Sequence, residues 1–201
     1  MSNYKVYRLF PAPVFHFKVE NFRELNLELE NYILELKKKN KDGQKKSNVG
    51  GWHSPFFNLE KDNAPKKFIQ NIQKFLQKVI EDEMGWEYIP NKVKIVSMWS
   101  IINNKNSFNI KHNHPNSYLS AAYYVKAPKN SGNINFYDTK EQKNIRTPKV
   151  KKFTDISAIV SSMEPEEGDL LLFPSYLYHA VEENLSDNNR IVISFNVDID
   201  A

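Results

Sequence analysis

The stretches 118-YLSAAYYVK-126, 169-DLLLF-173 and 190-RIVISFNVD-198 decide the fold, because each is a short aromatic or aliphatic run next to turn-forming residues. Clusters of Asn, Pro, Gly and Ser separate such runs along the second half of the chain. Eight short strands at this spacing predict a β-sandwich or barrel of the jelly-roll kind. The five remaining runs are 93–102, 108–114, 133–137, 157–162 and 177–182.

The first 90 residues follow a different pattern. Apolar residues recur at helical spacing over about 22–38 and again after Asn63, which predicts two amphipathic helices. Residues 4–18 read as one or two short strands broken by prolines, and 37–52 is typical of a solvated loop. We therefore expect an α+β, mainly β fold in which two N-terminal helices pack on the strands.

The length of 201 residues corresponds to a single domain. We expect that domain to span 1–201, with supporting elements in 1–90 and the strand-rich core in 91–201. No stretch resembles a signal peptide or a membrane span, so we expect a cytoplasmic protein without a membrane partner. The chain has no Cys, which excludes disulfide scaffolds, thiol catalysis and thiolate metal sites. Any metal must be held by His, Asp or Glu.

The basic charge of the chain is local. The net charge is +4, yet residues 37–46 alone hold six Lys and one Asp. This Lys-rich loop has no aromatic residue on which a base could stack, so nucleic acid is not an expected partner. The loop either attracts an acidic substrate or only solvates the chain.

Three of the five histidines lie in the strand-rich half. His112 and His114 are two residues apart, and on an extended chain they point to the same face, with Cα atoms about 7 Å apart. His179 lies on a later strand that a closed barrel can bring beside the first. The three could hold a metal, although each could also be a surface or hydrogen-bonded residue. His16 and His53 lack such company and are interpreted as structural.

Arg190 opens an otherwise apolar strand, and a charge at a buried position needs a partner. A small-molecule carboxylate would supply one in bidentate geometry. The alternative is a salt bridge from the strand end to a surface Asp or Glu.

Together these residues resemble the iron(II)- and 2-oxoglutarate-dependent oxygenases, and more closely a small branch known from marine bacteria and phages. The similarity runs from about residue 47 to 198. It implies a prolyl-hydroxylase-like double-stranded β-helix, which is a cupin-like jelly roll. The motifs that carry it are SNVGGWHS (47–54), MWSIINN (98–104), HNHPNSYLSAAYYVKAP (112–128), SGNINFYD (131–138), EEGDLLLFPSYLYHAV (166–181) and RIVISFNV (190–197).

The resemblance implies that His112 and His179 bind Fe(II). The family usually has Asp or Glu two residues after the first His, and this chain has His114 there. A neutral imidazole leaves the iron more positive than a carboxylate would. The alternative third ligand is Asp138, on a different segment.

The resemblance also implies a site for 2-oxoglutarate. Arg190 would bind its distal carboxylate, and Tyr124 would reach the same carboxylate, whereas Tyr123 would face the other way. Ser194 and Asn196 share the Arg190 face by strand alternation and are weaker candidates for this pocket.

The implied activity uses Fe(II), 2-oxoglutarate and O₂, and couples decarboxylation to hydroxylation of an unidentified protein side chain or small molecule. Variable loops, here 43–58 and 139–156, would form the pocket for that substrate. The alternatives are a cupin-type dioxygenase that does not use 2-oxoglutarate and a non-catalytic jelly-roll binding module. Replacing Arg190 with Ala discriminates between the two enzymes. A homodimer is compatible with the sequence.

Overall fold

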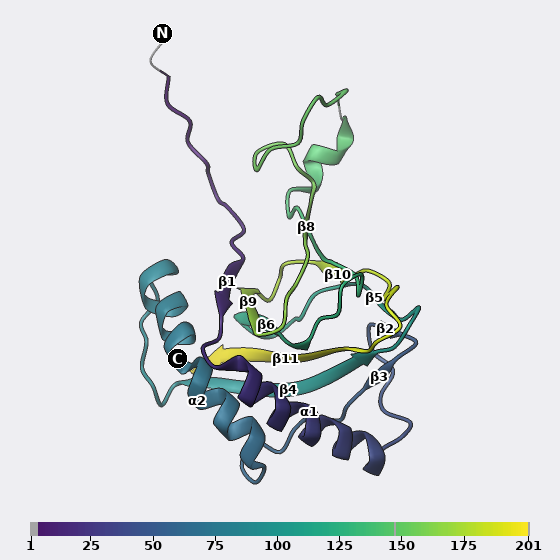
Figure 1. The fold of residues 1–201 in the computed structure, drawn as a ribbon. Coiled ribbons are helices and arrows are strands. Elements are labelled where there is room, and N and C mark those ends of the chain that lie inside the picture. The colour runs from purple at the N-terminus through teal and green to yellow at the C-terminus, as the bar shows by residue number, and fades with distance from the viewer. Residues whose placement is uncertain (1–3, 147, 201) are drawn as a thin grey trace.

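The computed structural model describes residues 4–146 and 148–200, and these residues form two antiparallel β-sheets that face each other (Figure 1). The major sheet has the strand order β1-β9-β6-β11-β4-β3, and the minor sheet has the order β2-β5-β10-β7-β8. In the major sheet the strands are β1 (Phe15–Lys18), β9 (Asp169–Pro174), β6 (Leu119–Lys126), β11 (Arg190–Ile199), β4 (Val93–Asn103) and β3 (Trp52–His53). In the minor sheet they are β2 (Asn48–Val49), β5 (Phe108–His112), β10 (His179–Val181), β7 (Ile134–Tyr137) and β8 (Val160–Met163).

Two helices, α1 (Phe22–Lys39) and α2 (Asn63–Lys78), cover the outer face of the major sheet (Figure 1). The centres of their apolar stripes are buried against it, and the ring of Phe68 packs 4.7 Å from the ring of Tyr123. The Tyr123 hydroxyl donates a hydrogen bond to the Asn26 side chain of α1 over 2.6 Å. A π-helical turn, η1 (Val79–Glu83), extends α2.

Strand alternation in β11 separates the core from the space between the sheets. Ile191, Ile193, Phe195 and Val197 are buried in the core beneath the helices. The intervening residues face the minor sheet, and they begin with Arg190. Because successive side chains of a strand point to opposite faces of the sheet, β11 contributes residues both to the core and to the space between the sheets.

All eight strands expected after residue 90 are present, with small shifts at their ends, and both helices are confirmed. The expectation of one or two strands over 4–18 is only partly right, because β1 is confined to Phe15–Lys18. Two prolines lie just before it, and proline interrupts strand pairing. The expected loop over 37–52 contains β2 and part of β3, which are too short to show a periodic pattern.

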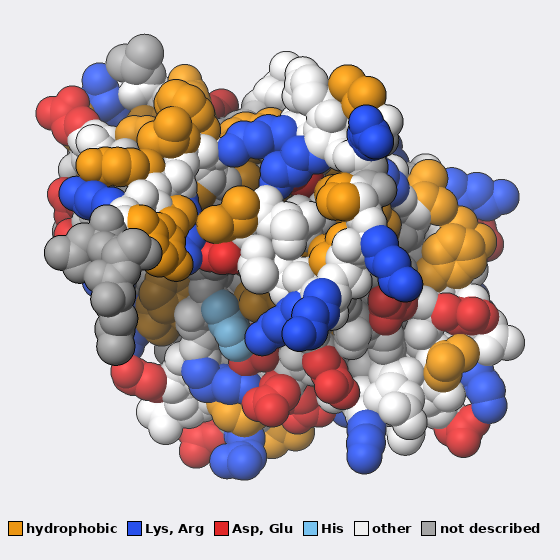
Figure 2. Space-filling model, turned by 90° about the horizontal axis from the view of Figure 1, so that it is seen from above, with side chains coloured by type: hydrophobic (Ala, Val, Ile, Leu, Met, Phe, Trp, Pro, Cys, Tyr) orange, Lys and Arg blue, Asp and Glu red, His pale blue; other side chains and the backbone are white. Residues whose placement is uncertain are grey.

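Residues 4–14 and the segment between β7 and β8, which contains the turn η2 (Glu141–Ile145), project on the same side (Figure 1). An ion pair of 2.8 Å between Arg8 and Asp155 joins them. Figure 2 looks down on this side, where exposed hydrophobic side chains lie among Lys and Arg. Among the described residues, no helix is long and apolar enough to cross a membrane.

Candidate metal centre

The pairing of β5 with β10 brings two histidines together. β5 ends at His112 and β10 begins at His179, and their Cα atoms are partners in the antiparallel register. His114 lies just beyond β5, where its backbone N–H donates to the Ser175 carbonyl over 2.9 Å. The expected strand over 108–114 is therefore too long, yet all three imidazoles converge.

The three rings form a compact cluster. One potential ligand nitrogen from each of His112, His114 and His179 lies within 4.8 Å of the others, which is close enough for one metal ion. The ring centroids are 4.3 Å apart for His112 and His179, and 5.2 Å apart for each of the other two pairs. Three nitrogen ligands grouped in this way leave other coordination positions open.

Backbone carbonyls fix the tautomers of two rings. Nδ1 of His112 lies 2.7 Å from the Ile110 carbonyl oxygen, and Nδ1 of His179 lies 3.0 Å from the Leu177 carbonyl oxygen. A carbonyl can only accept, so in each neutral ring Nδ1 carries the proton and Nε2 keeps its lone pair. This arrangement orients metal-binding histidines in proteins generally.

Burial keeps the imidazoles neutral. It lowers the pKa of His114 to about 4 and the pKa of His179 to about 3, and repulsion from His112 contributes to both shifts. Burial also lowers the pKa of His112. The neutral imidazole is the form that binds a metal, so the cluster is ready to bind one at neutral pH.

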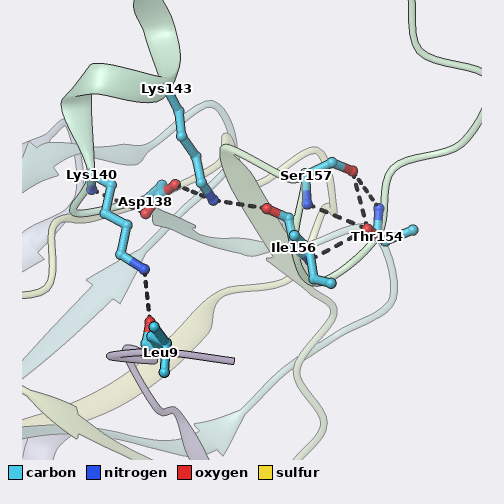
Figure 3. A network of polar contacts seen from close by, with 7 residues as sticks. All are labelled: Leu9, Asp138, Lys140, Lys143, Thr154, Ile156 and Ser157. Atoms are coloured by element: carbon cyan, nitrogen blue, oxygen red, sulfur yellow. Dashed lines mark hydrogen bonds and ion pairs between the residues drawn. The ribbon is translucent and has the colours of Figure 1, made fainter. Parts of the chain in front are cut away.

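Asp138 does not belong to this cluster. Its carboxylate forms a 2.7 Å ion pair with Lys143 and accepts a hydrogen bond from the Lys140 backbone N–H over 3.0 Å (Figure 3). Lys140 in turn donates to the Leu9 carbonyl over 3.0 Å, which links this network to the N-terminal residues. Among the described residues, the metal-ligand group at this site consists of imidazoles alone.

Arg190 is buried without a carboxylate partner among the described residues. Its Nη1 donates to the backbone carbonyls of Ser131, Gly132 and Glu182, the latter two over 3.2 and 3.4 Å. Its Nη2 is buried and has no hydrogen-bond partner. The side chain is only 1% exposed, so the guanidinium charge is neither hydrated nor neutralised. Such a charge is costly unless a ligand pairs with it.

A cavity of about 650 Å³ lies between the sheets and brings together all seven predicted site residues. They are His112, His114, His179, Arg190, Tyr124, Ser194 and Asn196. Tyr124 faces the cavity and Tyr123 faces the helical core, as strand alternation predicts. Burial raises the pKa of Tyr124, so its hydroxyl keeps its proton.

Asn196 is already engaged. Its Oδ1 accepts a hydrogen bond from Ser120 over 2.9 Å, and its Nδ2 donates to Ser97 over 3.2 Å. The Asn196 amide also partly offsets the effect of burial on the pKa of His114, which places it beside that imidazole. This geometry suits a residue that orients His114 better than one that binds a cosubstrate.

His53, interpreted from the sequence as structural although its glycine-rich loop could approach a pocket, lines the cavity. His53 is buried, and its ring stacks on Trp99 at 5.8 Å, while Trp99 stacks on His114 at 5.5 Å. The glycines of the SNVGGWHS motif were the available signal. Of the two loops expected to form the substrate pocket, 43–58 lines the cavity, whereas no described residue of 139–156 does.

The strand-rich half of the chain matches a described protein family. Residues 97–196, which include the three clustered histidines and Arg190, match the family described as "Putative 2OG-Fe(II) oxygenase". No curated protein matches the sequence.

Solved structures share the fold at low sequence identity. A prolyl-4-hydroxylase from Pseudomonas putida superposes with a TM-score of 0.67 and 10% identity, over 94% of each chain. HygX from Streptomyces hygroscopicus, solved with nickel and 2-oxoglutarate, gives 0.65 and 10%, over 94% of this chain and 83% of that one. The α-ketoglutarate-dependent carbocyclase SnoK from nogalamycin biosynthesis gives 0.66 and 11%, over 94% and 80%. The fold is therefore the double-stranded β-helix.

Proposed function

The chain belongs to the 2OG-Fe(II) oxygenases, and on that basis we propose that His112, His114 and His179 hold the iron and that Arg190 holds 2-oxoglutarate. When bound, iron, 2-oxoglutarate and O₂ supply oxidative decarboxylation coupled to hydroxylation of a substrate. The chain itself binds, orients and shields these groups.

The donor set supports the proposal at the metal end. Three neutral imidazoles suit a borderline divalent cation such as Fe(II). The carbonyls of Ile110 and Leu177 hold two of the rings with Nε2 toward the cluster. The Trp99 ring stacks on the third, His114, which stands in the place of the carboxylate that the family usually has.

The observation that most supports a 2-oxoglutarate site is Nη2 of Arg190, which is buried and has no hydrogen-bond partner. A carboxylate of 2-oxoglutarate would pair with it and remove the cost of a buried, uncompensated charge. The protonated hydroxyl of Tyr124 is a suitable second donor, and Ser194 lines the same part of the cavity. These residues give the cosubstrate a fixed direction relative to the histidines.

The same observation favours 2-oxoglutarate use over the cupin-type alternative. A three-histidine centre that needs no cosubstrate would have no use for a buried, unpaired Arg190 in its cavity. A sugar- or nucleic-acid-binding module would not need three converging neutral histidines.

The test is succinate production from 2-oxoglutarate with and without Fe(II), comparing the native chain with His179→Ala. His16→Ala is the matched control, because His16 lies on β1 and pairs with Asp169 at 3.0 Å. We expect iron-dependent turnover in the native chain and in the His16 variant only. Nickel binding that is unchanged in His179→Ala would contradict the proposed ligand set.

A further inference from the structure

We propose that the cavity takes a second anion beside 2-oxoglutarate, and that the substrate to be hydroxylated presents a carboxylate to Lys46. This inference rests on the proposed function and names the chemical class of its substrate.

The cavity is long enough for two ligands. In the major sheet β11 is followed by β4 and then β3, so Arg190 on β11 and His53 on β3 lie two strand spacings apart, about 10 Å. Lys46 lines the cavity with His53. The two ends are therefore separate sites, one at Arg190 and one at Lys46.

The backbone around Lys46 is held in place. Its N–H donates to the Asn48 side chain over 2.9 Å, and the next residue, Ser47, accepts a hydrogen bond from the Ile110 N–H over 2.9 Å. The Ser47 hydroxyl also accepts from the Asn109 side chain over 3.1 Å. Lys46 is thus fixed to β5 at the cavity, although it belongs to the Lys-rich loop.

The charge of the cavity is one-sided. No Asp or Glu is among the described residues that line it, whereas Lys46 and Arg190 both do. A divalent metal, Arg190 and Lys46 together carry four positive charges, and the imidazoles contribute none. Bound 2-oxoglutarate supplies two negative charges, one of them at Arg190. The site as a whole keeps a net charge of about +2 with no Asp or Glu of the cavity wall to balance it, and a negatively charged substrate is the natural complement.

At the Lys46 end of the cavity, two hydrogen-bond donors have no acceptor among the described residues. Lys46 makes no ion pair with a described Asp or Glu, and its charge contributes, after burial, to the lowered pKa of His53. The indole N–H of Trp99, beside His53, is buried and has no hydrogen-bond partner. A carboxylate at this end would pair with the Lys46 ammonium.

Two sources could supply that carboxylate, an acidic residue of a peptide or a small free acid. The probes are acetyl-Asp-methylamide and its neutral isostere acetyl-Asn-methylamide, each also placed within a five-residue Ala peptide. The measurement is the paramagnetic relaxation of the acetyl methyl protons beside Mn(II)-loaded protein at saturating 2-oxoglutarate. It reports binding near the metal and does not require turnover.

We expect the Asp probes to bind about fivefold more tightly than the Asn probes, the upper range for one partly exposed ion pair. Lys46→Gln should remove this preference and Lys46→Arg should keep it. Lys45→Gln is the matched control, since it removes the same charge from the neighbouring residue, which is exposed like Lys46 but does not line the cavity. Tighter binding of the Asp peptide than of the Asp monomer indicates a peptide substrate, and equal binding indicates a small acid.

Equal binding of Asp and Asn probes, or a preference that survives Lys46→Gln, would overturn the inference. The proposed function fails separately, if 2-oxoglutarate protons show no relaxation beside Mn(II).

Discussion

Replacing Arg190 with Met should abolish 2-oxoglutarate binding and leave metal binding intact. Met is unbranched and fills the space of the Arg190 aliphatic stem, but it has neither the guanidinium charge nor its donors. The Arg190 guanidinium is 1% exposed, and one of its nitrogens has no partner. The three histidines receive no hydrogen bond from it, so their geometry does not depend on it.

The magnitude follows from the contacts. A buried, charge-assisted pair with a carboxylate contributes about 3–5 kcal/mol when one partner is removed, which corresponds to a loss of affinity of about 10² to 10³-fold or more. At a ligand concentration of a hundred times Kd, the native protein gains about 2.7 kcal/mol. For a chain of this size, that gain raises Tm by about 5–10 °C.

The assay is thermal unfolding of Ni(II)-loaded protein with and without 2-oxoglutarate. Arg190→Met should lose the shift caused by 2-oxoglutarate and keep the shift caused by nickel. Arg190→Lys should bind about tenfold more weakly than the native chain, because an ammonium lacks the bidentate fork. Arg23→Met, on the exposed side of α1, should retain the full shift.

A 2-oxoglutarate shift that persists in Arg190→Met, with nickel binding unchanged, would show that Arg190 does not bind the cosubstrate. The carboxylate partner would then have to be sought elsewhere in the cavity.

Three further results are expected. His179→Ala should weaken Ni(II) binding, measured by equilibrium dialysis, by at least about a hundredfold. Replacing a residue that only supports a metal ligand already lowers metal affinity by up to about that factor. His16→Ala should leave Ni(II) affinity unchanged. In the metal-free protein, stability to urea should fall as the pH drops from 7.5 to 5. Burial lowers the pKa of His179 to about 3, so at pH 5 the ring is protonated in the unfolded chain but not in the folded one. This difference lowers the free energy of unfolding by about 2 kcal/mol at pH 5. A flat profile would contradict a buried neutral ring. Gly168→Ala should lower the free energy of unfolding by about 1–3 kcal/mol, because φ is +82° and the new Cβ would lie 2.4 Å from an aromatic side-chain carbon. Gly85→Ala, with φ +65° and no atom within 4 Å, should cost less.

Local patterns in the sequence predicted the elements well. The helical spacing of apolar residues predicted α1 and α2, and the short apolar runs predicted the eight strands after residue 90. Alternation in β11 also predicted that Arg190, Ser194 and Asn196 share a face, and all three line the cavity. Each of these features depends only on residues within one continuous segment, so it can be predicted from a single sequence.

The arrangement at the far end of the cavity was not predictable in this way. His53 and Lys46 lie in or beside strands of two residues, which show no periodicity. They line the cavity because β3 pairs with β4 and β2 pairs with β5. Likewise, the carboxylate of Asp138 was a candidate ligand until the fold placed it beside Lys143.

The residue types present in the chain limit the chemistry available to this protein. Without Cys, the metal donors had to be oxygen or imidazole nitrogen, and a charged residue opening an apolar strand had to meet a counter-charge. Which of these donors can share one metal depends on the fold, because His112 and His179 become neighbours through strand register. Register joins segments far apart in the chain, and it is set by the packing of the whole sheet rather than by either segment alone.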